Sequence, residues 1–327
     1  MPELVLFLSA VFAFFSLFRT KTARAGELKS RNPAIVLVTR GTTDPGELKG
    51  LTYIENQVKA AFPCYDVFMS FVSDEVREEW RNRDKDTNFK KYFPNVPEKF
   101  YSVKNPITTL ALIQETGARL VLVQSLSLID GPEYHDLVNL VENLRKIKTF
   151  ERERVPFPWI GLGAPALGLG DGQKENLHRV ANSLTPLFEE AKSLNAGVLL
   201  IADLAAGVNP GVYHNLRDIL RNNYENMEIH IGLPEARIGF RHVLSDLESR
   251  LPVPGPILLA PLTLVLGEEV RVDITGNQEN SWSNLVKESG YAAAFRMKGL
   301  AENYVFAEIF TESLKRLEEA VSRRYTD

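Results

Sequence analysis

Acidic residues follow three apolar, strand-like runs in the second half of the sequence: Asp203 after residues 198–202, Glu235 after residues 228–233, and Glu268 and Glu269 after residues 257–262. Ligands of open α/β sheets bind outside the carboxyl ends of the strands, so residues in these positions are candidates for a shared site. Neighbouring buried carboxylates raise one another's pKa, and such a group needs a cation, a proton or hydrogen-bond donors. A divalent metal ion would supply the cation.

Each of these residues also has a purely structural explanation. Asp203 and Asp273 could cap a helix or a turn. Glu268 and Glu269 are adjacent and are not expected to point the same way, so we expect one of them to be solvated. In the string RGTTD after the first strand-like run, Thr42 is typical of a helix N-cap, with a proline in the first turn of the helix.

The other chemical signatures narrow the kind of site. Cys64 is the only cysteine, which excludes an internal disulfide and a cysteine-built metal site, and its place before an apolar run favours a buried structural role. The five histidines show no spacing typical of metal ligands. No P-loop, nucleophile elbow or HExxH pattern is present, and the glycines of residues 161–172 lack the spacing of a dinucleotide fingerprint. Carboxylates are therefore the candidate ligands.

The whole chain must supply the elements that position these groups. Its 327 residues are 44% hydrophobic and carry a net charge of −4, so it can bury a large core and has no charge-driven attraction to nucleic acid. Apolar runs predict strands at residues 35–39, 64–71, 120–124, 158–162, 198–202, 228–233, 257–262 and 291–296. Amphipathic stretches predict helices at residues 46–61, 107–116, 134–148, 174–194, 211–223, 238–249 and 304–324. This alternation predicts an α/β fold with doubly wound parallel sheets.

An internal similarity predicts how the chain is divided. Residues 123–134 and 259–270 share leucine, glycine and glutamate positions, which indicates two similar lobes facing a central cleft. We predict an N-terminal α/β lobe at residues 33–165 and a C-terminal α/β lobe, carrying the metal site, at residues 166–327. The charged and aromatic residues 73–104 interrupt the first lobe, and we interpret them as an inserted helical excursion with a solvated face.

The first 25 residues differ from the rest. Residues 4–18 are apolar throughout, and an Ala-Arg-Ala string ends at residue 25, which is the layout of a secretory signal peptide. The apolar run is short for a membrane span, but positive residues follow it rather than precede it, so an uncleaved membrane anchor is the alternative. We expect the mature protein to begin near Gly26 and to be exported, for example to the periplasm.

Several motifs, in this order, resemble those of a known family. They include the strings GTT, VQSLSLIDGPEY, IGLPE and, as the most specific, GEEVRVDITGNQENSW at residues 267–282. The chain resembles the anaerobic sirohydrochlorin cobaltochelatases of the class II tetrapyrrole chelatase family from about residue 35 to the last predicted helix. The resemblance implies two doubly wound lobes, a tetrapyrrole bound between them, Co²⁺ delivered from the second lobe and a place in cobalamin biosynthesis.

The resemblance also implies roles for particular residues. The metal-binding and catalytic positions correspond to Asp203, Glu235 and Glu269, and the tetrapyrrole-contacting positions to Thr42, Ser127 and Glu133. This chain departs from the family where histidines are usual, because Asp203, Glu269 and Ser127 stand in those places. Imidazole suits Co²⁺ and Ni²⁺, whereas carboxylates suit harder ions, so selectivity for cobalt should be weaker.

The sequence is compatible with two functions. The first is a sirohydrochlorin cobaltochelatase-like lyase that inserts a divalent metal ion into a tetrapyrrole, with carboxylates accepting the two pyrrole protons. The second is a non-catalytic, exported relative that carries a tetrapyrrole or a metal. An unrelated periplasmic-type binding protein is disfavoured because its hinge strands are not recognisable. The metal, the ring and the number of chains are left open, and a homo-oligomer is as compatible with the sequence as a monomer.

Overall fold

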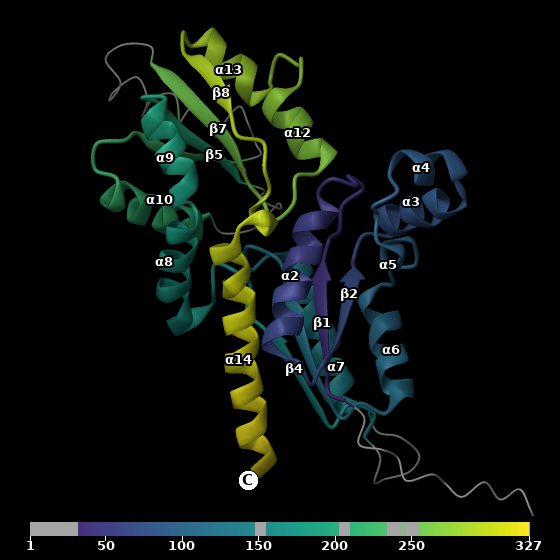
Figure 1. Ribbon diagram of the computed structural model, residues 1–327. Coiled ribbons are helices and arrows are strands. Elements are labelled where there is room, and N and C mark those ends of the chain that lie inside the picture. The colour runs from purple at the N-terminus through teal and green to yellow at the C-terminus, as the bar shows by residue number, and fades with distance from the viewer. Residues whose placement is uncertain are drawn as a thin grey trace, which may run out of the picture.

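The computed structural model describes residues 32–147, 155–202, 210–233 and 255–326, together with residues 243 and 245. Their strands form two parallel four-stranded sheets, ordered β2-β1-β3-β4 and β6-β5-β7-β8. The strands are β1 (Ala34–Thr39), β2 (Asp66–Phe71), β3 (Leu120–Ser125), β4 (Trp159–Gly163), β5 (Gly197–Ala202), β6 (Ile229–Gly232), β7 (Pro256–Leu262) and β8 (Ala292–Phe295). The predicted fold class, an α/β protein with two doubly wound lobes, is confirmed (Figure 1).

Helices cover both sheets, and we call each sheet with its covering helices a lobe. In the first half they are α2 (Leu48–Ala61), α3 (Asp74–Lys85), α4 (Thr87–Tyr92), α5 (Glu98–Tyr101), α6 (Pro106–Thr116) and α7 (Pro132–Lys146). In the second half they are α8 (Gln173–Ser183), α9 (Thr185–Ser193), α10 (Gly211–Asn223), α12 (Glu268–Thr275), α13 (Trp282–Glu288) and α14 (Tyr304–Thr326), with the short 3₁₀ helices η1 (Gly170–Gly172) and η2 (Leu300–Glu302). The helix predicted at residues 238–249 lies mostly outside the described residues.

Two local predictions were wrong. The strand expected from residue 64 begins at Asp66, so Cys64 lies in the turn after α2 and is exposed rather than buried. The single helix expected over residues 174–194 is two helices, because Pro186 lies in the first turn of α9. Proline has no N–H to continue the ladder of the preceding helix, and its ring clashes with the preceding turn.

The excursion at residues 73–104 is helical, as predicted, and is firmly attached to the first sheet. Arg77 is buried and donates from Nη1 to the carbonyl oxygen of Val72 at 2.6 Å. The fully buried indole of Trp80 donates from Nε1 to the carbonyl oxygen of Thr42 at 2.8 Å. Helix α3 is thereby held beside the loop that follows β1.

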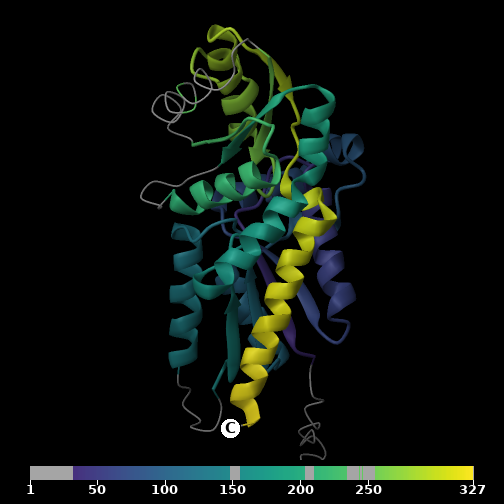
Figure 2. The ribbon, with the colours of Figure 1, turned by 90° about the vertical axis from the view of Figure 1, so that its left-hand side faces the viewer.

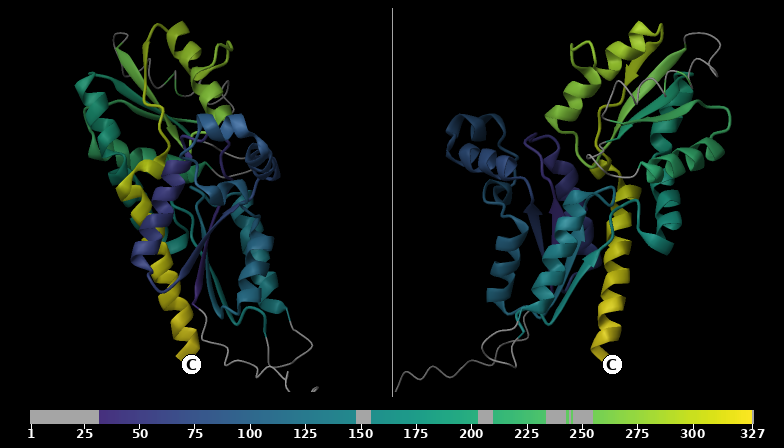
Figure 3. Two further views of the ribbon diagram at one scale, coloured as in Figure 1. Left: turned by 45° about the vertical axis from the view of Figure 1, so that its right-hand side comes forward. Right: turned by 180° about the vertical axis from the view of Figure 1, so that it is seen from behind.

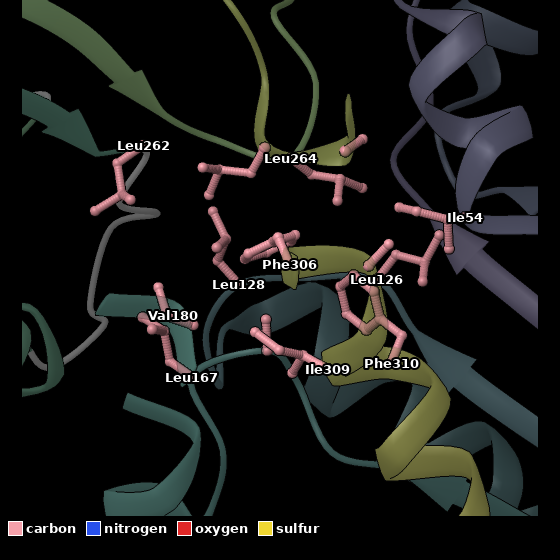
Figure 4. Packing of buried hydrophobic residues seen from close by; sticks show 14 of the residues in the cluster. Ile54, Leu126, Leu128, Leu167, Val180, Leu262, Leu264, Phe306, Ile309 and Phe310 are labelled. Carbon is pink, nitrogen blue, oxygen red and sulfur yellow. The ribbon is translucent and has the colours of Figure 1, made fainter. Parts of the chain in front are cut away.

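One hydrophobic core runs through both lobes. It joins Leu126 and Leu128, which follow β3, with Leu262, the last residue of β7, and Leu264, which follows β7. Phe306 of α14 packs between them (Figure 4). Separate clusters fill the opposite face of each sheet. The carboxyl ends of the parallel strands of both sheets therefore approach this shared core, where the two lobes meet (Figures 1 and 3).

The last helix lies on the first sheet although it follows the second sheet in the sequence. Helix α14 runs along the length of the first lobe, beside α2 and β4 (Figure 2). A Cβ atom added to Gly161 of β4 would lie 2.8 Å from Cδ1 of Leu317 in α14, so a larger residue here would displace the Leu317 side chain. The second half of the chain thus supplies part of the cover of the first lobe.

The predicted signal peptide or anchor, residues 1–25, lies outside the described residues. Among the helices that the structure does describe, none combines the length and the apolar character that a membrane span requires.

Candidate functional site

A cleft of about 880 Å³ lies where the two lobes meet. The loops after β1 and β3 line it from the first lobe, and the end of β5, the segment after β7 and helix α12 line it from the second. Four of the six residues predicted for the site, Thr42, Ser127, Glu133 and Glu269, line this one cleft. Asp203 and Glu235, the other two, lie outside the described residues.

Thr42 belongs to a tight turn and not to a helix cap. Its Oγ1 accepts a hydrogen bond from the backbone N–H of Asp44 at 3.0 Å, and Asp44 Oδ1 accepts one from Gly46 at 2.8 Å. Helix α2 begins only at Leu48, so the prediction of an N-cap at Thr42 was wrong. The side chains of Thr42 and Asp44 bond to nearby backbone N–H groups and so stabilise turns here, and the helix begins later in the chain.

Gly41, just before Thr42, fixes the shape of this wall. Its φ is +92°, in the left-handed region that favours glycine. An added Cβ atom would lie 2.7 Å from the ring of Phe71. The conformation and the close approach both require glycine, and together they bring the loop after β1 to the cleft.

Ser127 contributes a hydroxyl group from the loop after β3. Its Oγ lies 2.7 Å from Oγ of Ser125, which also accepts a hydrogen bond from the Ser127 backbone N–H at 3.2 Å. A neutral hydroxyl is a weak metal ligand, but it donates and accepts hydrogen bonds. Ser127 is therefore suited to contact polar groups of a bound ligand.

Glu133 stands in the first turn of α7 and faces Arg40, the residue directly after β1. Their side chains are 3.8 Å apart and are 43% and 60% exposed. An ion pair this exposed is worth about 0–1 kcal/mol, so a ligand can replace either partner. Arg40 was not among the residues predicted for the site, although it directly follows a strand, which is the signal that identified the acidic candidates.

Glu268 and Glu269 are the first two residues of helix α12, an element that was not predicted from the sequence. Gly267 is its N-cap residue, and the positive end of the helix dipole favours carboxylates in this first turn. Both residues are exposed and both line the cleft, where we expected one of them to be solvated. Successive residues of a helix lie about 100° apart, so the two side chains leave α12 in different directions, as expected.

The charged residues in the described lining of the cleft are predominantly acidic. Six carboxylates, those of Glu75, Glu79, Glu133, Glu268, Glu269 and Asp273, face two guanidinium groups, those of Arg40 and Arg83. Glu75, Glu79 and Arg83 come from α3, so the inserted excursion forms a wall of the cleft. Such an excess of negative charge attracts cations.

Arg83 is held in a fixed position within this wall. Its guanidinium packs against the rings of Trp80 and Phe89, 4.8 Å and 4.7 Å from their centroids, and its Nε donates to Glu79 at 2.8 Å. Arginine stacks on aromatic faces in this way because its charge is delocalised over a plane. The excursion therefore presents an ordered surface to the cleft.

Within the described ranges, no three histidine, cysteine, aspartate or glutamate side chains lie close enough to hold a metal ion. Because Asp203 and Glu235 are outside those ranges, the predicted convergence of three carboxylates stays a prediction. Ala202, the last residue of β5, does line the cleft.

The chain is similar to known proteins over most of its length. The family model of cobalt chelatase (CbiK) matches residues 33–320. The sirohydrochlorin cobaltochelatase CbiKC of Nitratidesulfovibrio vulgaris is 28% identical over 208 residues, which cover 59% of this chain and 64% of that protein, so the match spans less than two thirds of that relative. The sirohydrochlorin cobaltochelatase of Salmonella typhimurium is 23% identical over 283 residues, 86% of this chain and 94% of that protein.

Solved structures share the fold. The sirohydrochlorin chelatase SirB of Bacillus subtilis subspecies spizizenii, in complex with cobalt, superposes with a TM-score of 0.57 at 14% identity and covers 88% of this chain and 96% of that one. The multi-domain protein DR2241 of Deinococcus radiodurans, described as structurally similar to chelatases, gives a TM-score of 0.52 at 13% identity and covers 87% and 55%. At these identities the likeness concerns the fold.

Proposed function

Because this chain belongs to the cobalt chelatase family, we propose that it inserts a divalent metal ion into sirohydrochlorin or a related tetrapyrrole within the cleft between its lobes. The observation that supports this most directly is that Thr42, Ser127, Glu133 and Glu269, from both lobes, line a single cleft. Its volume of about 880 Å³ is within the range of about 300–1,000 Å³ typical of small-molecule sites.

In this proposal the second lobe supplies the metal. Glu269 borders the cleft from the start of α12, and Asp203 and Glu235 are proposed to complete the metal site. Carboxylates and the acidic lining would concentrate a divalent cation there. An all-oxygen set binds hard ions readily, so we propose that the protein discriminates less strongly in favour of Co²⁺ than a histidine-bearing relative does.

Metal insertion also releases protons. The ring loses its two pyrrole N–H protons as the divalent ion binds, and the product gains no net charge. Carboxylates near the bound ring can accept these protons and pass them to solvent. We propose this role for the same acidic residues. Thr42, Ser127 and Glu133 are proposed to orient the ring from the first lobe, with Arg40 available to a carboxylate substituent.

One experiment tests this function. The purified protein is incubated with sirohydrochlorin and, in turn, Co²⁺, Ni²⁺, Fe²⁺ and Mn²⁺, and the absorbance change on metalation is followed against a protein-free control. Metalation faster than the control supports the proposal. Tight binding of the ring without faster metalation would reject catalysis and support a non-catalytic tetrapyrrole carrier instead.

We also propose that the N-terminal segment directs export, with an uncleaved anchor as the alternative. The support is the apolar run and the small residues near position 25. Cell fractionation followed by N-terminal sequencing tests it. A terminus near Gly26 in the periplasm supports cleavage, and an intact terminus in the membrane fraction supports anchoring. Cytosolic protein with an intact terminus would reject both.

A further inference from the structure

Glu47 makes a polar contact between the lobes that lies outside the cleft lining. It precedes α2 in the first lobe, and only 7% of its surface is exposed. Its Oε2 accepts a hydrogen bond from the backbone N–H of Leu266 in the second lobe, at 2.9 Å, across 219 positions of sequence. Leu266 is itself fully buried. A buried carboxylate of one lobe is thus directed at the backbone of the other.

Leu266 lies in the segment that connects β7 to the first turn of α12, which carries Glu268 and Glu269. Leu266 immediately precedes Gly267, the N-cap of α12, and stands three residues before Glu269. Residues 263–265 line the cleft on the way. The Glu47 contact is therefore made just before the point where the chain turns to present Glu268 and Glu269.

The other end of this segment is held by backbone bonds. The carbonyl oxygens of Thr263 and Leu264 accept from the N–H groups of Leu300 and Ala301 in η2, at 2.9 Å and 2.8 Å. A Cβ atom added to Gly299 would lie 2.6 Å from the carbonyl oxygen of Leu264 and 3.0 Å from Glu47 Oε2. Gly299 therefore packs closely against this segment, and Glu47 holds the last residue of the segment, Leu266.

The surroundings of Glu47 disfavour the ionised form of its side chain. Burial raises the pKa of Glu47, and the nearby carboxylates of Glu302 and Asp44 raise it further. The hydrogen bond from Leu266 and the charge of Arg271 lower it. A leucine or methionine here would avoid the cost of desolvation but would leave the N–H of Leu266 unpaired. The contact with Leu266 thus accounts for a hydrogen-bond acceptor at this buried position.

We propose that Glu47 is a positioning residue for the metal site: by holding the backbone of Leu266 it fixes where α12 begins and so aims Glu269 into the cleft. Glu47 does not line the cleft, and we assign it no contact with the metal ion or the tetrapyrrole. The inference rests on the proposed function for the identity of the bound ion. The positioning itself is a property of the apoprotein and can be measured without any ligand.

The first measurement is hydrogen exchange of residues 263–270 by mass spectrometry on the full chain. Glu47→Ala removes the acceptor, so exchange in this segment should rise by about tenfold or more. Glu47→Gln keeps an amide oxygen in place of the carboxylate oxygen and should restore protection to within about threefold of the unaltered protein. Glu47→Asp withdraws the acceptor by one methylene while keeping the charge, and should be intermediate.

Glu55 provides the matched control. It is a second buried glutamate, on α2 itself, and it pairs with Lys59 at 2.7 Å and with Lys99, all within the first lobe. Glu55→Ala should lower the melting temperature but leave exchange of residues 263–270 unchanged. General loss of stability is thereby separated from loss of positioning.

The second measurement is Co²⁺ binding by isothermal titration calorimetry on the same proteins. Affinity should fall by about tenfold in Glu47→Ala and stay within about threefold of the original in Glu47→Gln and Glu55→Ala.

Three outcomes would each overturn the positioning role: unchanged exchange of residues 263–270 in Glu47→Ala, an equal rise in that exchange in Glu55→Ala, or no recovery of protection in Glu47→Gln. If the unaltered protein binds no Co²⁺ while the exchange pattern holds, the proposed function fails and the positioning role stands. If Glu47→Ala does not fold, Glu47→Asp and Glu47→Gln decide the comparison.

Discussion

Arg271 of α12 pairs with Asp44 of the loop after β1, with 3.3 Å between Nη2 and Oδ2. The pair joins the two lobes close to the bond between Glu47 and Leu266. Lys49 and Glu302 form a third polar contact there, at 3.2 Å. All three contacts involve residues at the start of α2 or just before it, so polar contacts between the lobes gather at this end of the helix.

The pair of Arg271 and Asp44 should contribute little to stability by itself. Its side chains are 39% and 34% exposed, and such partly solvated pairs are worth about 0–1 kcal/mol. A double-mutant cycle with Arg271→Ala and Asp44→Asn, measured by urea unfolding, should give a coupling free energy below about 1 kcal/mol that shrinks with added salt. A coupling energy of several kcal/mol, insensitive to salt, would contradict this.

Glu269→Gln should weaken metal binding while the fold survives. The change removes one negative charge from the cleft at nearly constant shape, and we expect the dissociation constant for Co²⁺ or Mn²⁺ to rise by about tenfold, or about 1.4 kcal/mol. Glu279→Gln is the control, because Glu279 is exposed in the same lobe but does not line the cleft. Equal titration curves for the two variants would remove Glu269 from the site.

Replacing Asp203 and Glu269 together by histidine should shift the metal preference. Imidazole binds Co²⁺ and Ni²⁺ better than a carboxylate does, whereas Mn²⁺ prefers oxygen. In the sirohydrochlorin absorbance assay, the ratio of the Co²⁺ rate to the Mn²⁺ rate should rise by about tenfold or more in the double variant. An unchanged ratio would indicate that the two side chains do not share one ion.

Gly41→Ala should destabilise the first lobe by about 1–3 kcal/mol, because alanine is strained at a φ of +92° and its Cβ would meet the ring of Phe71 at 2.7 Å. Gly172→Ala is the matched control, since an added Cβ there meets nothing within 4 Å and its φ is not positive. Urea unfolding of both variants provides the measurement. A Gly41→Ala protein as stable as Gly172→Ala would show that the loop after β1 adapts at little cost.

The burial of Glu47 predicts how stability depends on pH. A carboxyl whose pKa is raised in the folded state is favoured in its neutral form there, so its contribution is complete below its ordinary pKa of 4.5 and is lost as the pH rises through the folded pKa. Glu47→Gln carries no charge and has no such dependence. The difference in unfolding free energy between Glu47→Gln and the unaltered protein should therefore move in favour of the unaltered protein as the pH falls from 7 to about 4. A difference that is constant over this range would contradict the raised pKa.

The fold followed from local patterns because each buried strand is a continuous apolar run. Residues 34–39 and 197–202, for example, are buried throughout, and neither needed knowledge of distant contacts to be identified. The resemblance then marked Thr42, Ser127, Glu133 and Glu269 as site residues, and the structure brings these four to one cleft. Asp203 and Glu235 are the part of the predicted site that the described residues do not test.

What the sequence did not reveal depends on contacts between distant segments. Arg83 lies in a charged stretch that looks solvated, and its hydrogen bond to the carbonyl oxygen of Thr43, 40 positions away, holds it beside the loop after β1. Glu47 looks like an ordinary first-turn acid, because its partner Leu266 is 219 positions away. Neither contact leaves a periodic signal in the sequence, since periodicity reports on one element and its own buried face.

The placement of α14 on the first sheet has a consequence for biosynthesis. A ribosome finishes β4 roughly 160 residues before it finishes α14, an interval of about 10–30 s at typical elongation rates of about 5–20 residues per second. Throughout that interval Gly161 and its neighbours lack the helix that covers them in the finished protein. The nascent first lobe therefore displays an apolar surface to the cell until translation is nearly complete, and a chaperone that binds such surfaces would meet this chain at that stage.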